Sequence, residues 1–229
     1  SQPGSAAGAR SRSIAELGGG TMIRLALPKG RNLTVALEGF RAAGIGLSGL
    51  ELKDRRLQIV FPDDGLEVLL LKDWDVPLYV QYGIADCGVV GSDVLEEVDG
   101  DLLIPVRFRD GHCRMSLIGY ERELPQAGEQ IRLASKYPRT AKAVLADRSW
   151  GADVLKLNGS VELAPLLDLA EIALDIVQTG QTLRDNGLSE LEVVRRVAPC
   201  LVVNRSAYQV HRAQLNQWMA SLEAAEVVQ

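Results

Sequence analysis

The sequence predicts an α/β protein whose sheets are mostly parallel. Segments that read as strands alternate with segments that read as helices from residue 23 onward, and the connections between them are short. Several of the strand-like segments end in glycine-containing turns, at 28–31, 88–93, 158–160 and 178–182. Ligands of such sheets bind beyond the carboxyl ends of the strands, so these four turns are the candidate sites.

The composition is that of an ordinary globular protein. Hydrophobic residues make up 47% and charged residues 24% of the 229 residues, which excludes disorder of the whole chain. The formal net charge of -5 argues against a protein coated in basic charge for nucleic acid, but it allows a local basic pocket for a phosphorylated ligand. No fixed period repeats along the chain, which excludes a solenoid.

The sequence lacks the signals for secretion and for membrane insertion. No apolar run reaches the roughly 18 residues that a membrane span needs, and residues 1–21 have no apolar signal-peptide core. Cys87, Cys113 and Cys200 form no CxxC pair, so they predict neither a disulfide framework nor a zinc site. We therefore expect a cytoplasmic protein that binds neither membrane nor nucleic acid.

The first half of the chain predicts strands and helices in alternation. Residues 1–21 are rich in Ser, Gly, Ala and Arg without periodicity, so we interpret them as a disordered extension or a tag remnant. Apolar runs and flanking turns predict strands at 23–27, 57–61, 67–71, 85–90 and 102–106. Helices are predicted at 31–43, from Asp75-Val76-Pro77, and after Gly91-Ser92-Asp93.

The second half continues the same alternation. Strands are predicted at 113–120, 131–135, 153–157, 172–177, 191–197 and 200–203. Helices are predicted at 140–146, at 160–167, from the 178–182 loop to Asn186, and from about Ser206 to the C-terminal region. His211 lies on the last of these helices, where we expect it at the surface.

The most informative stretch is 175–187, where a buried strand ends in a loop of Thr179, Gly180, Gln181 and Thr182 before a helix. Free N–H groups and the dipole at a helix start favour an anion, and Gly180 lets the backbone approach a phosphate closely. Asp175 suits sugar hydroxyls. The alternative is an ordinary strand-to-helix turn capped by threonines. The absence of GxxxxGK[ST] argues against a Walker-type nucleotide hydrolase.

Basic residues gather in two turns of the first half. Lys29 and Arg31 lie in the turn after the first predicted strand, where point and fork donors suit a pyrophosphate. Cations at a helix start oppose the helix dipole, which weakens the alternative of solvated surface charge. Arg55 and Arg56 form another cluster before the next strand, and alone this cluster reads as a solvated hairpin.

Two further turns have the order strand, turn, helix. In 83–94, Gly91 ends a buried strand before Ser92 and Asp93. In 156–165, Ser160 is placed to cap a helix. Taken alone, each turn is better explained by structure than by function.

Histidine and cysteine give little support for nucleophilic catalysis. His112 and His211 are the only histidines and lie far apart, so a hydrolytic triad is poorly supported. Cys113 is better explained as a buried small hydrophobe than as a catalytic thiol.

Taken together, these stretches resemble the catalytic subunit of the ATP phosphoribosyltransferase family. The resemblance covers essentially 22–222, and six motifs carry it in the family's order, which makes it specific. They are LALPKGR (25–31), DVPLYVQYGIADCGVVGSDVLEE (75–97), CRMSL (113–117), IRLASKYP (131–138), KLNGSVELAPL (156–166) and DIVQTGQTLRDNGL (175–188).

The resemblance implies a two-lobed fold like that of the type II periplasmic binding proteins, with the active site in the cleft between the lobes. One lobe would hold 22–108 and 189–229, and the other 109–188. The chain's length looks like the family's short form. Short forms work with a regulatory subunit similar to histidyl-tRNA synthetase, usually in a hetero-octamer, and a homodimer of catalytic subunits is also implied.

The resemblance also implies the reaction, which joins N1 of ATP to C1 of phosphoribosyl pyrophosphate and releases pyrophosphate. Magnesium would be carried on the substrate rather than by protein ligands. Arg31 and Arg55, supported by Lys29 and Arg56, would stabilise the departing pyrophosphate. The phosphoribosyl pyrophosphate site would comprise Asp175, Thr179, Gly180, Gln181, Thr182, Leu183 and Glu162. The ATP side or cleft wall would comprise Lys72, Gly91, Ser92, Asp93, Cys113 and Ser160.

Two positions depart from the family pattern, and two rival functions remain. Lys72 stands where many members have Arg, and Gln178 where many have Asp, Glu or Ser. Lysine keeps the charge but lacks the planar fork for bidentate binding, and glutamine supplies no carboxylate for the sugar. The first rival is a non-catalytic two-lobed binding module. The cations at several converging strand ends argue against it, because such a module does not need them. The second is a purine- or orotate-type phosphoribosyltransferase, whose loop usually follows adjacent acids that this chain lacks.

Overall fold

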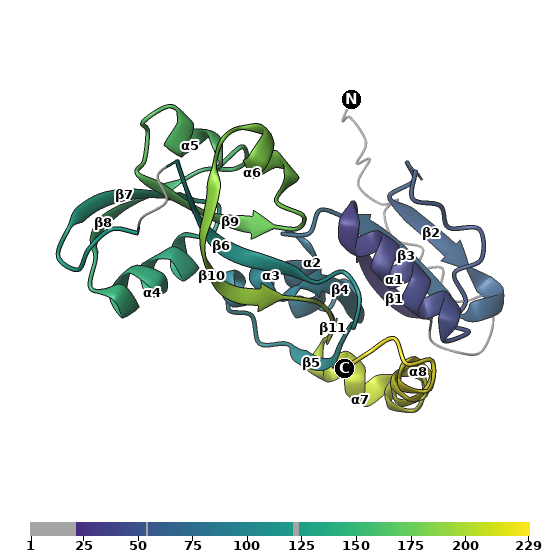
Figure 1. Ribbon diagram of the computed structural model, residues 1–229. Helices are drawn as coiled ribbons and strands as arrows, with labels where there is room; N and C mark the ends of the chain where they lie inside the picture. Colours follow the sequence, from purple (N-terminus) through teal and green to yellow (C-terminus); the bar gives the residue numbers. More distant parts are fainter. Residues whose placement is uncertain (1–21, 54, 121–123) are drawn as a thin grey trace, which may run out of the picture.

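The chain forms two sheets with helices packed on them, one sheet in each of two lobes (Figure 1). The computed structural model describes residues 22–53, 55–120 and 124–229, so the interpretation of 1–21 lies outside the described residues. The first part of the first lobe consists of β1 (Ile23–Pro28), α1 (Arg31–Ala42), β2 (Gln58–Phe61), η2 (Pro62–Asp64), β3 (Leu66–Leu71), α2 (Val76–Gln81), β4 (Cys87–Gly91), α3 (Ser92–Val98) and β5 (Leu103–Arg107).

The chain then builds the second lobe and returns to the first. The second lobe consists of β6 (Cys113–Gly119), β7 (Gln130–Ser135), α4 (Pro138–Arg148), β8 (Gly151–Lys156), α5 (Leu163–Leu166), β9 (Ile172–Val177), α6 (Gln181–Asp185) and β10 (Ser189–Val197). The return consists of β11 (Pro199–Val203), α7 (Arg205–Val210) and α8 (Arg212–Ala224).

The two sheets are mixed, and the expectation of mostly parallel sheets is wrong. In the first sheet, with order β2-β3-β1-β4-β11-β5, β1 runs parallel to β3 and β4, and the other pairs are antiparallel. In the second, with order β10-β6-β9-β7-β8, β7 runs parallel to β8 and β9, and β6 runs antiparallel to β9 and β10. The antiparallel pairs arise where the chain crosses between lobes and in the β2–β3 hairpin.

The strand β10 belongs to the second sheet, although we expected everything from residue 189 onward in the first lobe. It pairs with β6 along its length, from Ser189 opposite Gly119 to Val197 opposite Cys113. The first-lobe sheet resumes only at β11, which pairs with β4 and β5. Figure 1 shows β10 leading from one lobe to β11 in the other, so the second chain crossing lies at Ala198.

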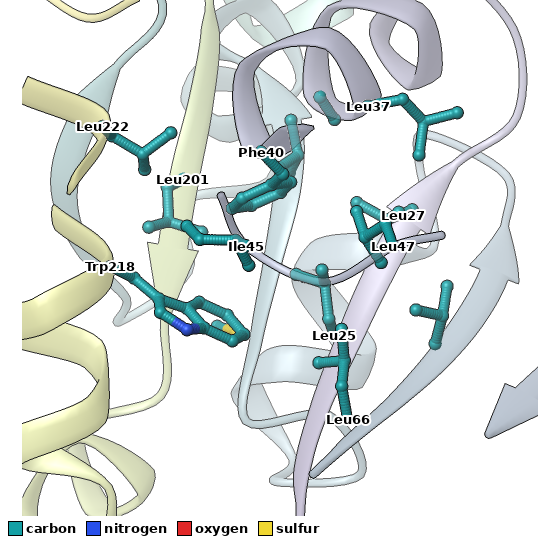
Figure 2. Packing of buried hydrophobic residues seen from close by; sticks show 14 of the residues in the cluster. Leu25, Leu27, Leu37, Phe40, Ile45, Leu47, Leu66, Leu201, Trp218 and Leu222 are labelled. Atoms are coloured by element: carbon teal, nitrogen blue, oxygen red, sulfur yellow. The ribbon is translucent and has the colours of Figure 1, made fainter. Parts of the chain in front are cut away.

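The C-terminal helix completes the core of the N-terminal sheet. Phe40 of α1 is fully buried, and its ring lies 6.1 Å from Phe108 and 5.9 Å from Trp218 of α8, centroid to centroid. Figure 2 shows Trp218 and Leu222 pointing from α8 toward Phe40 and Ile45. Residues from both ends of the chain therefore bury the same apolar surface, and α8 forms part of the core of the first lobe.

The C-terminal region also differs in detail from the prediction. The single helix predicted from Ser206 is two helices, α7 and α8, which meet at His211. His211 is only 9% exposed, and its Nε2 lies 3.8 Å from Asp86 Oδ2, so the expectation of a surface histidine is wrong. The three cysteines are buried and free. No helix in the described ranges is long and apolar enough to cross a membrane.

Candidate active site

The topology of the first sheet brings the predicted cations to one edge. Pro28 at the end of β1 is paired with Leu71 at the end of β3, and Lys29 N donates to Leu71 O at 2.8 Å. Lys29 and Lys72 therefore follow neighbouring strand ends. The antiparallel β2 begins at the same edge, because Leu70 N donates to Leu57 O, so Arg55 and Arg56 lead into it there. These four cations are exposed, whereas Arg31 at the start of α1 is half-buried.

Four buried side-chain atoms at this edge have no hydrogen-bond partner within the described ranges. They are Arg31 Nε, Asn32 Oδ1, Asp73 Oδ1 and Asp93 Oδ1. A buried polar atom left unpaired costs about 1–3 kcal/mol, so a cluster of them indicates a place prepared for a ligand. Sequence reasoning included Arg31 and Asp93 but missed Asn32 and Asp73. Both follow strand ends next to predicted residues, which was the available signal.

Gly91 allows two of these side chains to pack against the backbone. A Cβ atom at this position would lie 2.1 Å from Asp93 Oδ1 and 3.5 Å from Asn32 Nδ2. Any larger residue would displace Asp93, which is only 6% exposed. Ser92 Oγ accepts a 3.3 Å hydrogen bond from Ala198 N. The turn after β4 is therefore hydrogen-bonded to the segment in which the chain passes from one lobe to the other.

Charge and burial perturb the titratable groups of this half of the site. Burial raises the pKa of Asp73 from 3.8 to about 6, and the Asp93 carboxylate adds to the rise while Arg31 and Lys136 oppose it. Burial also raises the pKa of the Cys113 thiol, against the opposing effect of Arg31. Cys113 is therefore a protonated, buried side chain in the wall of the site near Arg31. Its burial agrees with the interpretation of this residue as a small hydrophobe.

The second lobe contributes a cavity of about 310 Å³ at the carboxyl end of β9. Its lining includes all seven residues predicted for phosphoribosyl pyrophosphate: Glu162, Asp175, Thr179, Gly180, Gln181, Thr182 and Leu183. Gly180 has φ 72°, the left-handed region that glycine favours. Gln178 also lines the cavity, whereas Ser160 is exposed in the turn before α5 and is not among the lining residues.

Two carboxyl groups belong to this second-lobe cavity. Burial raises the pKa of Asp175 from 3.8 to about 6. The hydrogen bond from Ile176 N to Asp175 Oδ1, at 2.8 Å, opposes the rise, while the Glu162 carboxylate adds to it. Acceptors of this kind suit hydroxyl donors, which the cavity would meet in a sugar.

The two halves meet at Asp93 and Tyr137. Tyr137, two residues after the end of β7 and just before α4, donates from its hydroxyl to Asp93 Oδ2 at 2.7 Å. Trp74 of the first lobe packs its ring 5.4 Å from that of Tyr137, and Lys136 Nζ lies 5.1 Å from the Trp74 ring centre. The charge of Lys136 opposes the rise that burial causes in the pKa of both Asp73 and Asp175. Sequence reasoning missed Trp74, Lys136 and Tyr137, although the last two lie inside a quoted motif.

A larger cavity, of about 570 Å³, lies away from this region. Gly119, Ile131 and Ile172 line it, which places it at the end of the second sheet opposite Cys113 and Val177. It holds none of the predicted site residues. The described ranges also contain no group of three or more His, Cys, Asp or Glu residues arranged to hold a metal ion.

These features define a two-lobed α/β protein. One lobe has a sheet edge with several cations and buried polar atoms that lack hydrogen-bond partners, and the other has a cavity lined by a glycine-containing loop. The family model of ATP phosphoribosyltransferase matches residues 72–224. The chain belongs to the ATP phosphoribosyltransferase family. It transfers the phosphoribosyl group of phosphoribosyl pyrophosphate to N1 of ATP, giving phosphoribosyl-ATP and pyrophosphate in the first step of histidine biosynthesis.

Individual relatives agree with the family match. The ATP phosphoribosyltransferase of Deinococcus radiodurans is 43% identical over 200 residues, covering 87% of this chain and 89% of that protein. The Thermus thermophilus enzyme is 43% identical over 193 residues, covering 84% and 91%.

Solved structures agree on the fold. The ATP phosphoribosyl transferase (HisG:HisZ) complex from Thermotoga maritima matches with a TM-score of 0.75 at 29% identity, covering 89% of this chain and 98% of that chain. A histidine kinase sensor domain with similarity to periplasmic binding proteins matches with a TM-score of 0.55 at 9% identity, which bears on the fold alone. The expected two-lobed fold is therefore confirmed.

Proposed function

We propose that the cationic edge of the first lobe binds and stabilises the departing pyrophosphate. Arg31 and Arg55 are the principal donors in this proposal, with Lys29 and Arg56 in support. Arg31 has the strongest support, because its half-buried side chain keeps a buried Nε unpaired and its charge acts on Asp73. Preorganised cations aimed at developing negative charge lower the barrier without having to reorganise during the reaction.

The second lobe holds the phosphoribosyl group in this proposal. The loop from Thr179 to Leu183 binds the 5-phosphate, and Asp175 and Glu162 accept hydrogen bonds from the ribose hydroxyls. The support is that these residues line one cavity and that Gly180 allows the left-handed turn in its loop. Gln178, on the same cavity, supplies a neutral amide rather than a carboxylate.

ATP occupies the first-lobe side, next to Asp93 and the turn formed by Gly91 and Ser92, with Cys113 as part of the wall. Lys72 follows β3 at the cationic edge and gives a point charge for the triphosphate rather than a planar fork. Ser160 has the weakest support among the proposed residues, because it lies outside the described cavity lining.

The chemistry in this proposal requires positioning more than proton transfer. The lone pair on N1 of adenine attacks C1 of the ribose as the bond from C1 to the pyrophosphate oxygen breaks, and the electron pair leaves with the pyrophosphate. The sugar carries oxocarbenium character at the transition state, so the two lobes must hold donor and acceptor in line. Magnesium enters with the substrate, held by phosphate oxygens and water.

We propose the same partners that the resemblance implies. The Thermotoga maritima structure is named as a complex of two different chains. By analogy, this chain works with a regulatory subunit similar to histidyl-tRNA synthetase in a hetero-octamer, and it pairs with a second copy of itself. Sedimentation of the chain alone and with such a subunit tests both assemblies.

Turnover tests the function directly. The chain is mixed with ATP, phosphoribosyl pyrophosphate and Mg²⁺, with pyrophosphatase added to remove product, and near-ultraviolet absorbance is followed because alkylation at N1 changes the adenine chromophore. A rise that requires both substrates is the expected result. No rise with the chain alone or with the regulatory subunit added would contradict the assignment, and a control without phosphoribosyl pyrophosphate excludes slow ATP breakdown.

A further inference from the structure

The helix α3 of the first lobe contacts the second lobe along its whole length. Its first residue, Ser92, is bonded to Ala198 at the chain crossing, with Ser92 N donating to Ala198 O at 2.9 Å. Asp93 binds the Tyr137 hydroxyl, Glu96 pairs with Arg195 of β10, and Asp99, just after the helix, pairs with Arg139 at 2.7 Å. In Figure 1, α4 lies along the β7–β8 side of the second sheet, and α3 lies closer to β4 of the first sheet.

Glu97 makes the most specific of these contacts, because it caps a helix of the other lobe. Its carboxylate accepts hydrogen bonds from Arg139 N at 2.7 Å, from Thr140 N at 3.0 Å and from Thr140 Oγ1 at 3.1 Å. Both amides lie in the first turn of α4. The helix has no side-chain cap of its own, since Tyr137 stands at the cap position and Pro138 carries no N–H. A carboxylate there also complements the helix dipole.

Asp93 and Glu97 both form hydrogen bonds with one short segment, residues 137–140. They are four residues apart on α3 and therefore share a face, while their partners Tyr137 and Thr140 are three residues apart at the start of α4. The same segment carries Lys136, whose charge acts on Asp73 in one lobe and Asp175 in the other. The position of this segment thus sets how the two halves of the site face each other.

We propose that Glu97 is a positioning residue for phosphoribosyl transfer: by capping α4 from the other lobe, it holds the two half-sites in register. The inference rests on the proposed function, because it assigns ATP to one half and the sugar to the other. Each half-site keeps its own residues when Glu97 is lost. Binding of each substrate should therefore survive, while the alignment that chemistry requires should not.

Three variants test the inference in the full chain. Glu97→Ala removes the cap, and we expect kcat to fall about 10- to 100-fold while the KM for each substrate stays within about twofold. Glu97→Gln keeps one acceptor oxygen and should lower kcat by only about three- to fivefold relative to wild type, with a smaller acceleration of amide exchange than in Glu97→Ala. Asp99→Asn is the matched control. It removes an ion pair between the same two helices, but that pair is exposed and contributes little, so kcat should stay within about twofold.

Amide hydrogen exchange supplies a readout apart from activity. Exchange at Arg139 and Thr140 should accelerate at least about tenfold in Glu97→Ala and remain unchanged in Asp99→Asn. Wild-type turnover together with a kcat within twofold in Glu97→Ala would overturn this inference alone, as would equal losses in Glu97→Ala and Asp99→Asn. A wild-type chain inactive even with its regulatory subunit would overturn the proposed function and this inference with it. If Glu97→Ala does not fold, Glu97→Gln decides, since unchanged exchange and kcat there overturn the inference.

Discussion

The two halves of the site satisfy their polar groups in opposite ways. In the first lobe, Arg31, Asn32, Asp73 and Asp93 each keep a buried atom without a partner within the described ranges. In the second lobe, the exposed loop bonds to itself, with Arg184 Nη1 donating to Thr179 O at 3.1 Å and Arg184 Nη2 to Gln181 Oε1 at 2.9 Å. The polar groups of the first half are already positioned and unpaired, so they can bind a ligand directly. The loop of the second half must break hydrogen bonds within itself before it can form hydrogen bonds with a ligand.

This difference separates two kinds of effect. A prearranged, desolvated group acts most strongly on charge that develops in the transition state, so changes in the first half should appear in kcat. A loop that exchanges its own hydrogen bonds for those of a phosphate contributes mainly to binding, so changes in the second half should appear in KM. The predictions below test this division, beginning with the largest expected effect.

Arg31→Ala should lower kcat about 100- to 1000-fold, because it removes a half-buried donor from the proposed pyrophosphate site. ATP affinity, measured by equilibrium titration, should change only a few-fold. Arg55→Ala should act in the same direction. Arg31→Lys is the control that keeps the charge but loses the planar fork, and it should recover only part of the loss. Unchanged turnover in Arg31→Ala would remove this residue from the leaving-group role.

Gly180→Ala should raise the KM for phosphoribosyl pyrophosphate about tenfold and change kcat less. The φ of 72° strains any residue with a Cβ, and that atom would lie 3.3 Å from Arg184 Nη1 in the loop. Gly187→Ala is the matched control, since its φ of 70° carries the same strain but no atom lies near its Cβ and it does not line the cavity. Equal increases in KM for both variants would mean that general loop strain, not the site, is responsible.

Tyr137→Phe tests the contact that joins the halves. The hydroxyl is the partner of Asp93 Oδ2, and Asp93 Oδ1 is already unpaired, so the variant leaves the whole buried carboxylate without a described partner. We expect the free energy of unfolding to fall by about 1–3 kcal/mol and kcat to fall about tenfold. Denaturant unfolding at pH 7 measures the first quantity. A double variant with Asp93→Asn should lose less than the sum, because the two groups share one interaction.

Residues that sequence reasoning took from one local stretch also lie together in the structure. The seven residues predicted for phosphoribosyl pyrophosphate line one cavity, and five of them are consecutive from Thr179 to Leu183. A loop after a strand keeps its residues together wherever the strand lies in the sheet. The same reasoning placed Lys29, Arg31 and Lys72 after strand ends, and the register of β1 and β3 brings those ends together.

Sequence reasoning failed where the outcome depends on contacts distant along the chain. Asp93 and Tyr137 are 44 residues apart, so nothing local to either predicts their bond. His211 is buried near Asp86, and the pairing of β10 with β6 follows from where the chain crosses between lobes. Periodicity detects strands, but it does not say which sheet they join or in which direction they run.

The smallest predicted effect concerns a carboxyl group in each lobe. Burial raises the pKa of both Asp73 and Asp175 to about 6. A carboxyl whose folded pKa is raised binds its proton more tightly in the folded chain. Its stabilising contribution is therefore full below about pH 4 and is lost as pH rises through about 6. Asp73→Asn should gain stability relative to wild type over that range, by about 1–2 kcal/mol after allowing for partial exposure, and the gain should level off above pH 7.

Thermal unfolding of wild type and variants from pH 4 to pH 8 measures this gain. Asp175→Asn should follow the same curve, because burial is the main cause in both lobes, yet it should also raise the KM for phosphoribosyl pyrophosphate. Glu171→Gln supplies the opposite sign: Arg132 lowers the pKa of Glu171, so that group's contribution is lost as pH falls. A pH-independent difference between Asp73→Asn and wild type would show that this carboxyl keeps an ordinary pKa. Its unpaired oxygen would then reflect packing rather than a desolvated half-site.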